Sequence, residues 1–254
     1  MKRFSPGLTC LAAFGWFAPV SSYAVAGNEG ALPKGFVYLR EADPSIIQDM
    51  RYATPHNFTG KPVPGYNAGE CVLRRSAAEA LKRAQEKAEK LGYSLKVYDC
   101  YRPADAVRAF VAWAGAPEDG RTKGYYPHLK KSKLVPNYIA PQSQHSTGTA
   151  VDLTLVPAGA APQAPAGEAK DCTAPQREGD GSLDMGTAFD CFDPKATTAS
   201  HLITPEERKN RETLKKILEG AGFKNYAAEW WHFSYSGEKS ARRYDFPIEP
   251  RPEH

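Results

Sequence analysis

The sequence lacks an apolar run long enough to cross a membrane, and it carries no strong excess of charge of one sign. Its main apolar stretch, from about residue 8 to residue 20, is broken by Gly and Pro. A spanning helix needs roughly 20 apolar residues. The 33 basic and 29 acidic residues leave a net charge of +4, which is small and evenly spread. We therefore expect no nucleic-acid partner and no stable membrane insertion. The sequence does not indicate which oligomeric state the protein adopts.

The first residues have the form of a secretory signal peptide. Met1-Lys2-Arg3 is a short basic start, and Ala24-Val25-Ala26 after the apolar stretch is a small-x-small cleavage site. We expect residues 1–26 to be removed, and residues 27–254 to form a periplasmic or secreted protein. A membrane anchor is the alternative, and the short, interrupted apolar run disfavours it.

Cys-x-x-Cys motifs and tight cysteine–histidine spacings are also absent, which disfavours a cysteine-ligated zinc cluster. Four of the five cysteines follow the expected cleavage site. An even number in an oxidising compartment predicts up to two disulfides, with three possible pairings. We favour Cys172 with Cys191 as the local pair, which leaves Cys71 with Cys100.

What is present suffices for one folded domain, because 41% of the residues are hydrophobic and 11% are aromatic. Helical spacing and stop or capping signals alternate with short runs of branched and aromatic residues. Three helices are expected: one over residues 76–91, one that begins near Pro103 and one that begins at Pro205. Four strands are expected: residues 36–39, 95–101 and 150–155, and one that begins near Trp231. This alternation predicts a single α+β domain, in which we expect a small antiparallel sheet to pack with helices around a cleft.

The segment from about residue 156 to residue 181 differs from the rest of the chain. It is rich in Pro, Ala and Gly and has almost no large apolar residue, so it cannot form a core of its own. We expect an exposed loop inserted in the domain and tied down through Cys172.

Three pieces of the sequence carry residues that suit metal chemistry. In the first, His145 on a turn and Asp152 on the following strand could converge on one ion, and their nitrogen and oxygen atoms both suit zinc. In the second, Glu229-Trp-Trp-His232, His232 would add a third ligand. Glu229 would lie beside the metal only if it sits on the turn before the strand, because the two side chains would face opposite sides of a regular strand. The third is Arg102, where a predicted strand meets a predicted helix.

Taken singly, these residues have ordinary structural explanations. A lone histidine or aspartate is more often structural or solvated than a metal ligand. Arg102 alone is typical of a surface or salt-bridge residue, and the paired tryptophans at 230–231 are typical of a core. Only the combination is specific.

Together, the set SxHxxGxAxD and ExWH resembles the metal-binding signature of the D-alanyl-D-alanine peptidases, a zinc group that includes the VanX-type D-alanyl-D-alanine dipeptidases. The resemblance covers roughly residues 32–248, and Cys100 stands where these dipeptidases have glycine in GYRP. The segments with counterparts in the same order are RYATPHNFTGKP (51–62), YRP (101–103), SQHSTGTAVDLTL (143–155), MGTAFD (185–190), EWWHF (229–233) and YDFP (244–247).

The resemblance implies one zinc ion per chain, with His145, Asp152 and His232 as its ligands. It implies that Glu229 is the catalytic base and that Arg102 stabilises the transition state. Arginine stays protonated and offers a fork of donors, so lysine should not replace it fully.

The resemblance also implies a substrate pocket. Asp190 becomes a candidate partner for the free amino group of the substrate, while Ser143 and Tyr52 would line the pocket. A buried carboxylate that needs an ammonium would disfavour longer peptides, whose blocked amine leaves it unpaired.

The resemblance therefore implies hydrolysis of the small molecule D-alanyl-D-alanine to two D-alanines, in cell-wall dipeptide turnover or glycopeptide resistance. A zinc D,D-carboxypeptidase that acts on peptidoglycan peptides is the alternative. A non-catalytic zinc or wall-binding domain is a third possibility, and Glu229 argues against it because a structural metal site needs no base.

Overall fold

The computed structural model describes residue 1 and residues 32–163, 171–175, 179–238 and 242–252. The chain divides into two units, Met1–Ala31 and Leu32–His254, and the elements of the fold belong to the second. The expected signal peptide and its cleavage site lie outside the described residues, apart from Met1. None of the described helices is long and apolar enough to cross a bilayer.

The strands of the second unit form two sheets. The smaller pairs β1 with β3 antiparallel, and the larger has the order β2-β4-β5-β7-β6. The strands are β1 (Phe36–Tyr38), β2 (Ile47–Gln48), β3 (Val72–Arg74), β4 (Tyr93–Asp99), β5 (Ala150–Pro157), β6 (Phe223–Asn225) and β7 (His232–Tyr235). The pairings from β4 to β6 are antiparallel as predicted, whereas β2 joins β4 in parallel. The main sheet is therefore mixed, because the long connection from β2 to β4, which contains α2, allows a parallel crossover.

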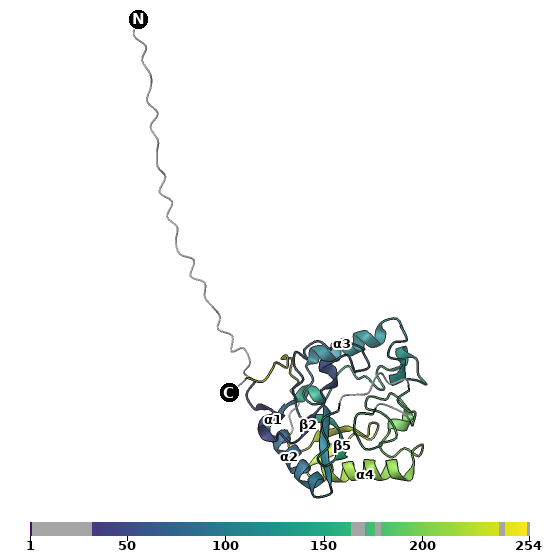
Figure 1. Cartoon of the computed structure of the whole chain (residues 1–254). Helices are drawn as coiled ribbons and strands as arrows, with labels where there is room; N and C mark the ends of the chain where they lie inside the picture. The colour runs from purple at the N-terminus through teal and green to yellow at the C-terminus, as the bar shows by residue number, and fades with distance from the viewer. Residues whose placement is uncertain (2–31, 164–170, 176–178, 239–241, 253–254) are drawn as a thin grey trace. The chain divides into compact units, whose positions relative to one another are not determined.

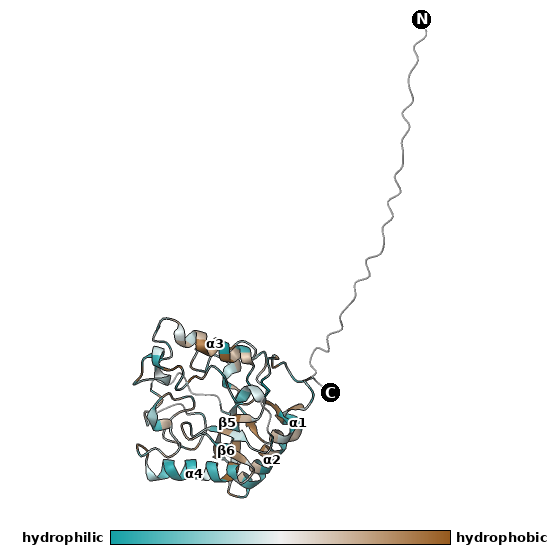
Figure 2. Ribbon diagram, turned by 180° about the vertical axis from the view of Figure 1, so that it is seen from behind, coloured by the Kyte–Doolittle hydropathy of each residue, from teal (hydrophilic) through white to brown (hydrophobic). Residues whose placement is uncertain are grey.

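Helices pack around the main sheet. The described helices are α1 (Leu39–Ala42), α2 (Arg75–Glu89), α3 (Ala104–Gly115) and α4 (Pro205–Glu219), with short 3-10 helices at Arg51–Ala53, Lys123–Tyr125, Lys131–Lys133, His145–Thr147 and Pro194–Ala196. α2 and α4 contact each other and the sheet, whereas α3 lies apart from them (Figure 1). The ribbon of α4 is largely hydrophilic and the strands beside it are more hydrophobic, as expected for an outer helix that covers a core (Figure 2).

Local sequence signals explain where the main helices begin and end. The predicted capping box starts α4, because Thr204 Oγ1 accepts from Glu207 N at 3.2 Å and Thr204 N donates to Glu207 Oε2 at 2.6 Å. α2 buries its Ala and Leu residues at helical spacing and is followed by Gly92, whose φ of +82° suits a glycine turn.

The four cysteines form two disulfides, paired as predicted. Cys71–Cys100 joins the start of β3 to the end of β4, and Cys172–Cys191 joins the segment 171–175 to the loop before Pro194–Ala196. The inserted segment is thus tied down through Cys172 as expected. Asp180 near its end is only 8% exposed, so this residue is buried, contrary to the expectation of an exposed loop.

Candidate active site and metal centre

Neighbouring strands of the main sheet place acidic and imidazole side chains side by side. Asp99 on β4 is opposite Asp152 on β5, and Asp152 is in turn opposite His232 on β7. Opposed residues on paired strands project from the same face of a sheet. The register therefore brings Asp152 and His232 together although 80 positions separate them.

His145 reaches the same point from the 3-10 helix before β5. This helix ends at Gly148, whose φ is +77° and where a Cβ would collide with the ring of Phe36, so glycine is required. His145 Nδ1 donates to the carbonyl oxygen of Cys100 at 2.7 Å. That bond leaves the lone pair of Nε2 directed at Asp152 and His232.

The donor atoms of these three residues fit a single metal ion. His145 Nε2 lies 3.2 Å from Asp152 Oδ1 and 3.0 Å from His232 Nδ1, and His232 Nδ1 lies 2.9 Å from Asp152 Oδ1. A tetrahedral zinc ion with ligands near 2.1 Å would hold neighbouring donors roughly 3.4 Å apart. The predicted ligands are thus assembled as a group that could hold a metal.

Glu229 lies on the turn before β7, which is the position the sequence required of it. Its backbone carbonyl accepts from His232 N at 3.3 Å, and its Oε2 is 3.9 Å from His232 Nδ1. Burial raises the pKa of Glu229 to about 7, against the opposing charges of His232 and Arg102. A carboxyl whose pKa lies near neutrality suits a general base.

Arg102 lies between the end of β4 and the start of α3, as predicted. Its Nε and Nη2 donate to Asp99 Oδ2 at 2.9 and 2.8 Å, and its Nη2 lies 3.4 Å from Asp152 Oδ2. The guanidinium also stacks over the rings of Tyr52 and Phe110, at 5.2 and 5.1 Å from their centroids. These contacts hold a permanent positive charge next to the metal-binding group.

Asp190 is buried at 5% exposure, and its Oδ2 accepts a hydrogen bond from the hydroxyl of Tyr52 at 2.8 Å. Burial raises the pKa of Asp190 well above its usual range, and the nearby charge of Asp152 adds to this effect. An arriving cation would favour the ionised form. Asp190 is therefore suited to bind a positively charged group.

A cleft of about 210 Å³ joins these features, and all eight residues singled out from the sequence line it. Ser143 is among them, and its Oγ accepts from His145 N at 3.2 Å. Aromatic side chains form much of the remaining lining, namely Phe58, Phe110, Tyr138, Phe192, Tyr226 and Trp231. Drug-sized ligands occupy pockets of roughly 300–1,000 Å³, so this cleft suits a smaller molecule.

Comparison with known proteins places the chain in a family. Residues 33–249 match the model of the D-ala-D-ala dipeptidases, peptidase family M15. The chain belongs to this family. It is 38% identical to the D-alanyl-D-alanine dipeptidase of Enterococcus faecium over 218 residues, which are 84% of this chain and 98% of that protein. It is 29% identical to the dipeptidase of Escherichia coli K12 over 193 residues, 75% of this chain and 79% of that one.

A solved structure also aligns with this M15 peptidase. It is described as "Structure of the LdcB LD-carboxypeptidase reveals the molecular basis of peptidoglycan recognition". The alignment has a TM-score of 0.37 and 21% identity, and it covers 66% of this chain and 61% of that chain.

Sequence reasoning missed one residue in the M15 site, Asp99. It is fully buried and contacts both Arg102 and His145, with its Oδ2 3.3 Å from His145 Nδ1, and it accepts from the hydroxyl of Tyr66 at 2.6 Å. Its place at the end of a predicted strand, three residues before Arg102, was the available signal. Asp99 thus contacts two of the side chains that the sequence singled out.

Proposed function

We propose that the chain is an exported, zinc-dependent dipeptidase that hydrolyses D-alanyl-D-alanine to two molecules of D-alanine. One observation carries the proposal. A single small cleft contains a group of metal-binding donors, a carboxyl with a pKa near neutrality and a second, buried carboxyl. Family membership supports the same reaction, since the curated relatives bear the name of this dipeptidase.

In this proposal His145, Asp152 and His232 hold the zinc ion. When bound, zinc supplies a Lewis acid that polarises the peptide carbonyl and lowers the pKa of water towards neutrality. Glu229 accepts the proton of the attacking water and delivers it to the leaving amine. Arg102 donates hydrogen bonds to the developing oxyanion, an effect of about 3 kcal/mol for one well-placed donor.

Asp190 and Tyr52, which are hydrogen-bonded to each other in the lining of the cleft, would select a dipeptide. The ionised carboxylate of Asp190 pairs with the free ammonium of the substrate. A longer or N-acylated peptide has no charge at that point and would leave the buried carboxylate without its partner. Ser143 lines the same cleft, where it would contact the substrate.

The direct test measures D-alanine released from D-alanyl-D-alanine by the purified protein lacking residues 1–26. The assay is run with the metal intact, after chelation and after zinc is restored, beside the N-acetylated dipeptide. We expect zinc-dependent cleavage of the free dipeptide alone. No cleavage of either substrate by a folded, zinc-loaded protein would contradict the proposal.

The same experiment separates the alternative, a D,D-carboxypeptidase that acts on peptidoglycan peptides. Such an enzyme would cleave the blocked peptide and leave the free dipeptide intact. A residue that binds ammonium would have no use there, so Asp190 favours the dipeptidase.

Export is the second part of the proposal, with residues 1–26 as the cleaved signal and the remaining chain periplasmic or secreted. The two disulfides support it, because disulfides persist in oxidising compartments. Sequencing the N-terminus of the protein recovered outside the cytoplasm tests it. A mature chain that still begins at Met1 would contradict cleavage.

A further inference from the structure

The backbone at Asp190 has an unusual conformation. Its φ of +57° makes it the one non-glycine residue with a positive φ in the described part of the chain. Aspartate tolerates this left-handed region better than most residues, but the region is still disfavoured. Such a conformation persists where the surroundings fix it, and it is often found where it serves a function.

The next residue, Cys191, ties this backbone to a second segment. Its disulfide partner Cys172 donates from its backbone N to Gly124 O at 2.9 Å and accepts from Ala188 N at 2.9 Å. Both half-cystines are at most 1% exposed. The disulfide therefore links the loop before and after Asp190 to the 3-10 helix Lys123–Tyr125.

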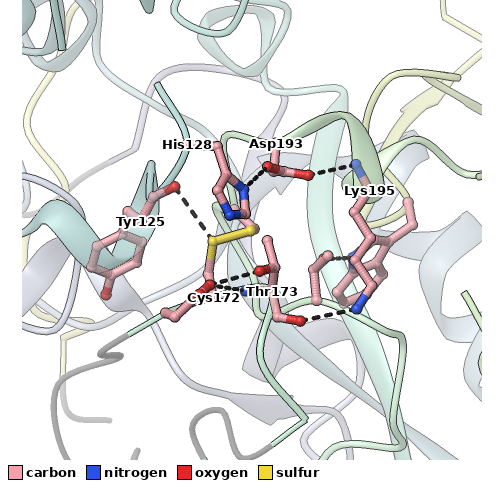
Figure 3. The surroundings of a disulfide bond; sticks show 10 residues. Tyr125, His128, Cys172, Thr173, Asp193 and Lys195 are labelled. Atoms are coloured by element: carbon pink, nitrogen blue, oxygen red, sulfur yellow. Dashed lines mark hydrogen bonds and ion pairs between the residues drawn. A yellow bond between two sulfur atoms is a disulfide. The ribbon is translucent and has the colours of Figure 1, made fainter. Parts of the chain in front are cut away.

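Further contacts fasten the same segments, as Figure 3 shows around the disulfide. Phe192 N donates to Tyr125 O at 2.8 Å, and Lys195 Nζ donates to Thr173 O at 2.9 Å. Phe192 lines the cleft beside Asp190. The disulfide is thus the covalent link between two segments, one of which contributes Asp190 and Phe192 to the lining of the cleft.

We propose that the Cys172–Cys191 disulfide is a positioning element for substrate recognition, which holds the carboxyl of Asp190 at the hydroxyl of Tyr52 where the ammonium of the substrate binds. The inference rests on the proposed dipeptidase function. Without the covalent link, the loop can relax from the left-handed conformation at Asp190. The carboxyl then moves from its place, and the preference for a free amine falls.

The test compares two ligands that differ in the amine alone, D-alanyl-D-alanine and N-propionyl-D-alanine. Their dissociation constants are measured by calorimetry on zinc-loaded Glu229→Gln protein, in which loss of the base slows hydrolysis of either ligand during the measurement. In this parent the free amine should bind more tightly. In the added Cys172→Ala/Cys191→Ala variant that advantage should fall by about tenfold, which corresponds to about 1.4 kcal/mol, while binding of the propionyl ligand stays the same.

Two further variants separate positioning from general loosening. In an Asp190→Asn background, removing the disulfide should cause no additional loss, because the group it positions is gone. Cys71→Ala/Cys100→Ala removes the other disulfide of the same domain. The backbone carbonyl of Cys100 is hydrogen-bonded to His145, and this disulfide is not next to Asp190 in the chain. That variant should keep the advantage of the free amine, and an equal loss in both disulfide variants would overturn the inference.

The outcomes distinguish the inference from the function on which it rests. A parent that binds both ligands equally contradicts ammonium recognition, and with it both proposals. A parent whose advantage survives loss of the Cys172–Cys191 disulfide contradicts the inference alone. If the double variant does not fold by circular dichroism, Lys195→Met weakens the link between the same segments, and a smaller loss in the same direction is expected. An unchanged advantage there would also count against the inference.

Discussion

Two groups of buried charged side chains in this protein differ in whether their positive and negative charges balance. In the first, which we call the closed ion cluster, Asp180 Oδ2 lies 2.9 Å from Arg51 Nη2 and 2.8 Å from Lys96 Nζ, and Arg51 Nε lies 2.8 Å from Asp49 Oδ2. Two cations face two anions, and Tyr98 adds a hydrogen bond to Asp180 at 2.6 Å. The charges balance without any added group.

The cleft is the second group, and its charges do not balance. Its described lining holds the carboxyls of Asp152, Asp190 and Glu229 but the single guanidinium of Arg102. These three carboxyls share one guanidinium, and that guanidinium also pairs with the buried carboxylate of Asp99. Buried charges are normally paired or bind metals. This difference supports the proposal that cations from outside, a metal ion and a substrate ammonium, complete the cleft, whereas the closed ion cluster stabilises the fold.

Removing one of the proposed metal ligands should have the largest effect on the cleft. We expect His232→Ala to weaken metal binding by more than about 100-fold and to abolish hydrolysis, because changes even to residues behind the ligands cost 10- to 100-fold. Metal content by mass spectrometry and D-alanine release are the measurements. The exposed His201→Ala is the matched control and should retain both. Full metal content in His232→Ala would remove it from the ligand set.

Glu229→Gln should have the next largest effect. It keeps the size of the side chain but removes the base, so kcat should fall by about 100- to 10,000-fold while the zinc content stays the same. Glu212→Gln, at an exposed position on α4, should leave kcat unchanged. If Glu229→Gln retains parental kcat, another group accepts the proton.

The closed ion cluster should respond in stability, not in chemistry. Asp180→Asn leaves two buried cations with one fewer anion, so the free energy of unfolding should fall by about 3 kcal/mol. The kcat of the remaining folded protein should be close to that of the parent. Urea denaturation measures the first quantity. Asp119→Asn breaks an exposed ion pair with Arg121 and should change the free energy of unfolding far less. Equal losses in the two variants would mean that burial of the cluster contributes nothing.

The same contrast shows what the sequence could predict. His145, Asp152 and His232 lie within motifs whose spacing carries information, and helix α4 begins with a local capping signal. The fold class followed from the alternation of helix and strand signals. The disulfides followed from the even number of cysteines and from the favoured local pair. The geometry of the site depends on the register of the strands. That register brings His145, Asp152 and His232 together, as the sequence analysis expected.

What escaped prediction depends on contacts between distant segments. Arg51 and Asp180 are 129 residues apart, and no local pattern links them. The low content of large apolar residues near Asp180 predicted exposure, yet ion pairs bury that residue. The parallel pairing of β2 likewise depends on which edge of the sheet is open, since two residues give no directional signal.

The two groups should also respond oppositely to pH in the metal-free protein. Burial raises the pKa of Glu229 from its ordinary 4.5 to about 7, so the folded state binds the extra proton. Its contribution is present below pH 4.5 and is lost as the pH rises through 7. For Asp180, the charges of Lys96 and Arg51 outweigh the effect of burial and lower the pKa from 3.8 to about 2. That contribution is present above pH 3.8 and is lost as the pH falls through 2.

Difference curves isolate each group. The free energy of unfolding of metal-free parent minus that of Glu229→Gln should fall by up to about 3 kcal/mol between pH 4.5 and 7. Parent minus Asp180→Asn should rise by about 2 kcal/mol between pH 2 and 4. Zinc should suppress the first change, because its charge favours ionised Glu229, and should leave the second unaltered, because the closed ion cluster has no part in binding it. If zinc does not alter the curve for parent minus Glu229→Gln, Glu229 lies away from the metal. The cleft and the closed ion cluster would then not differ in their response to zinc.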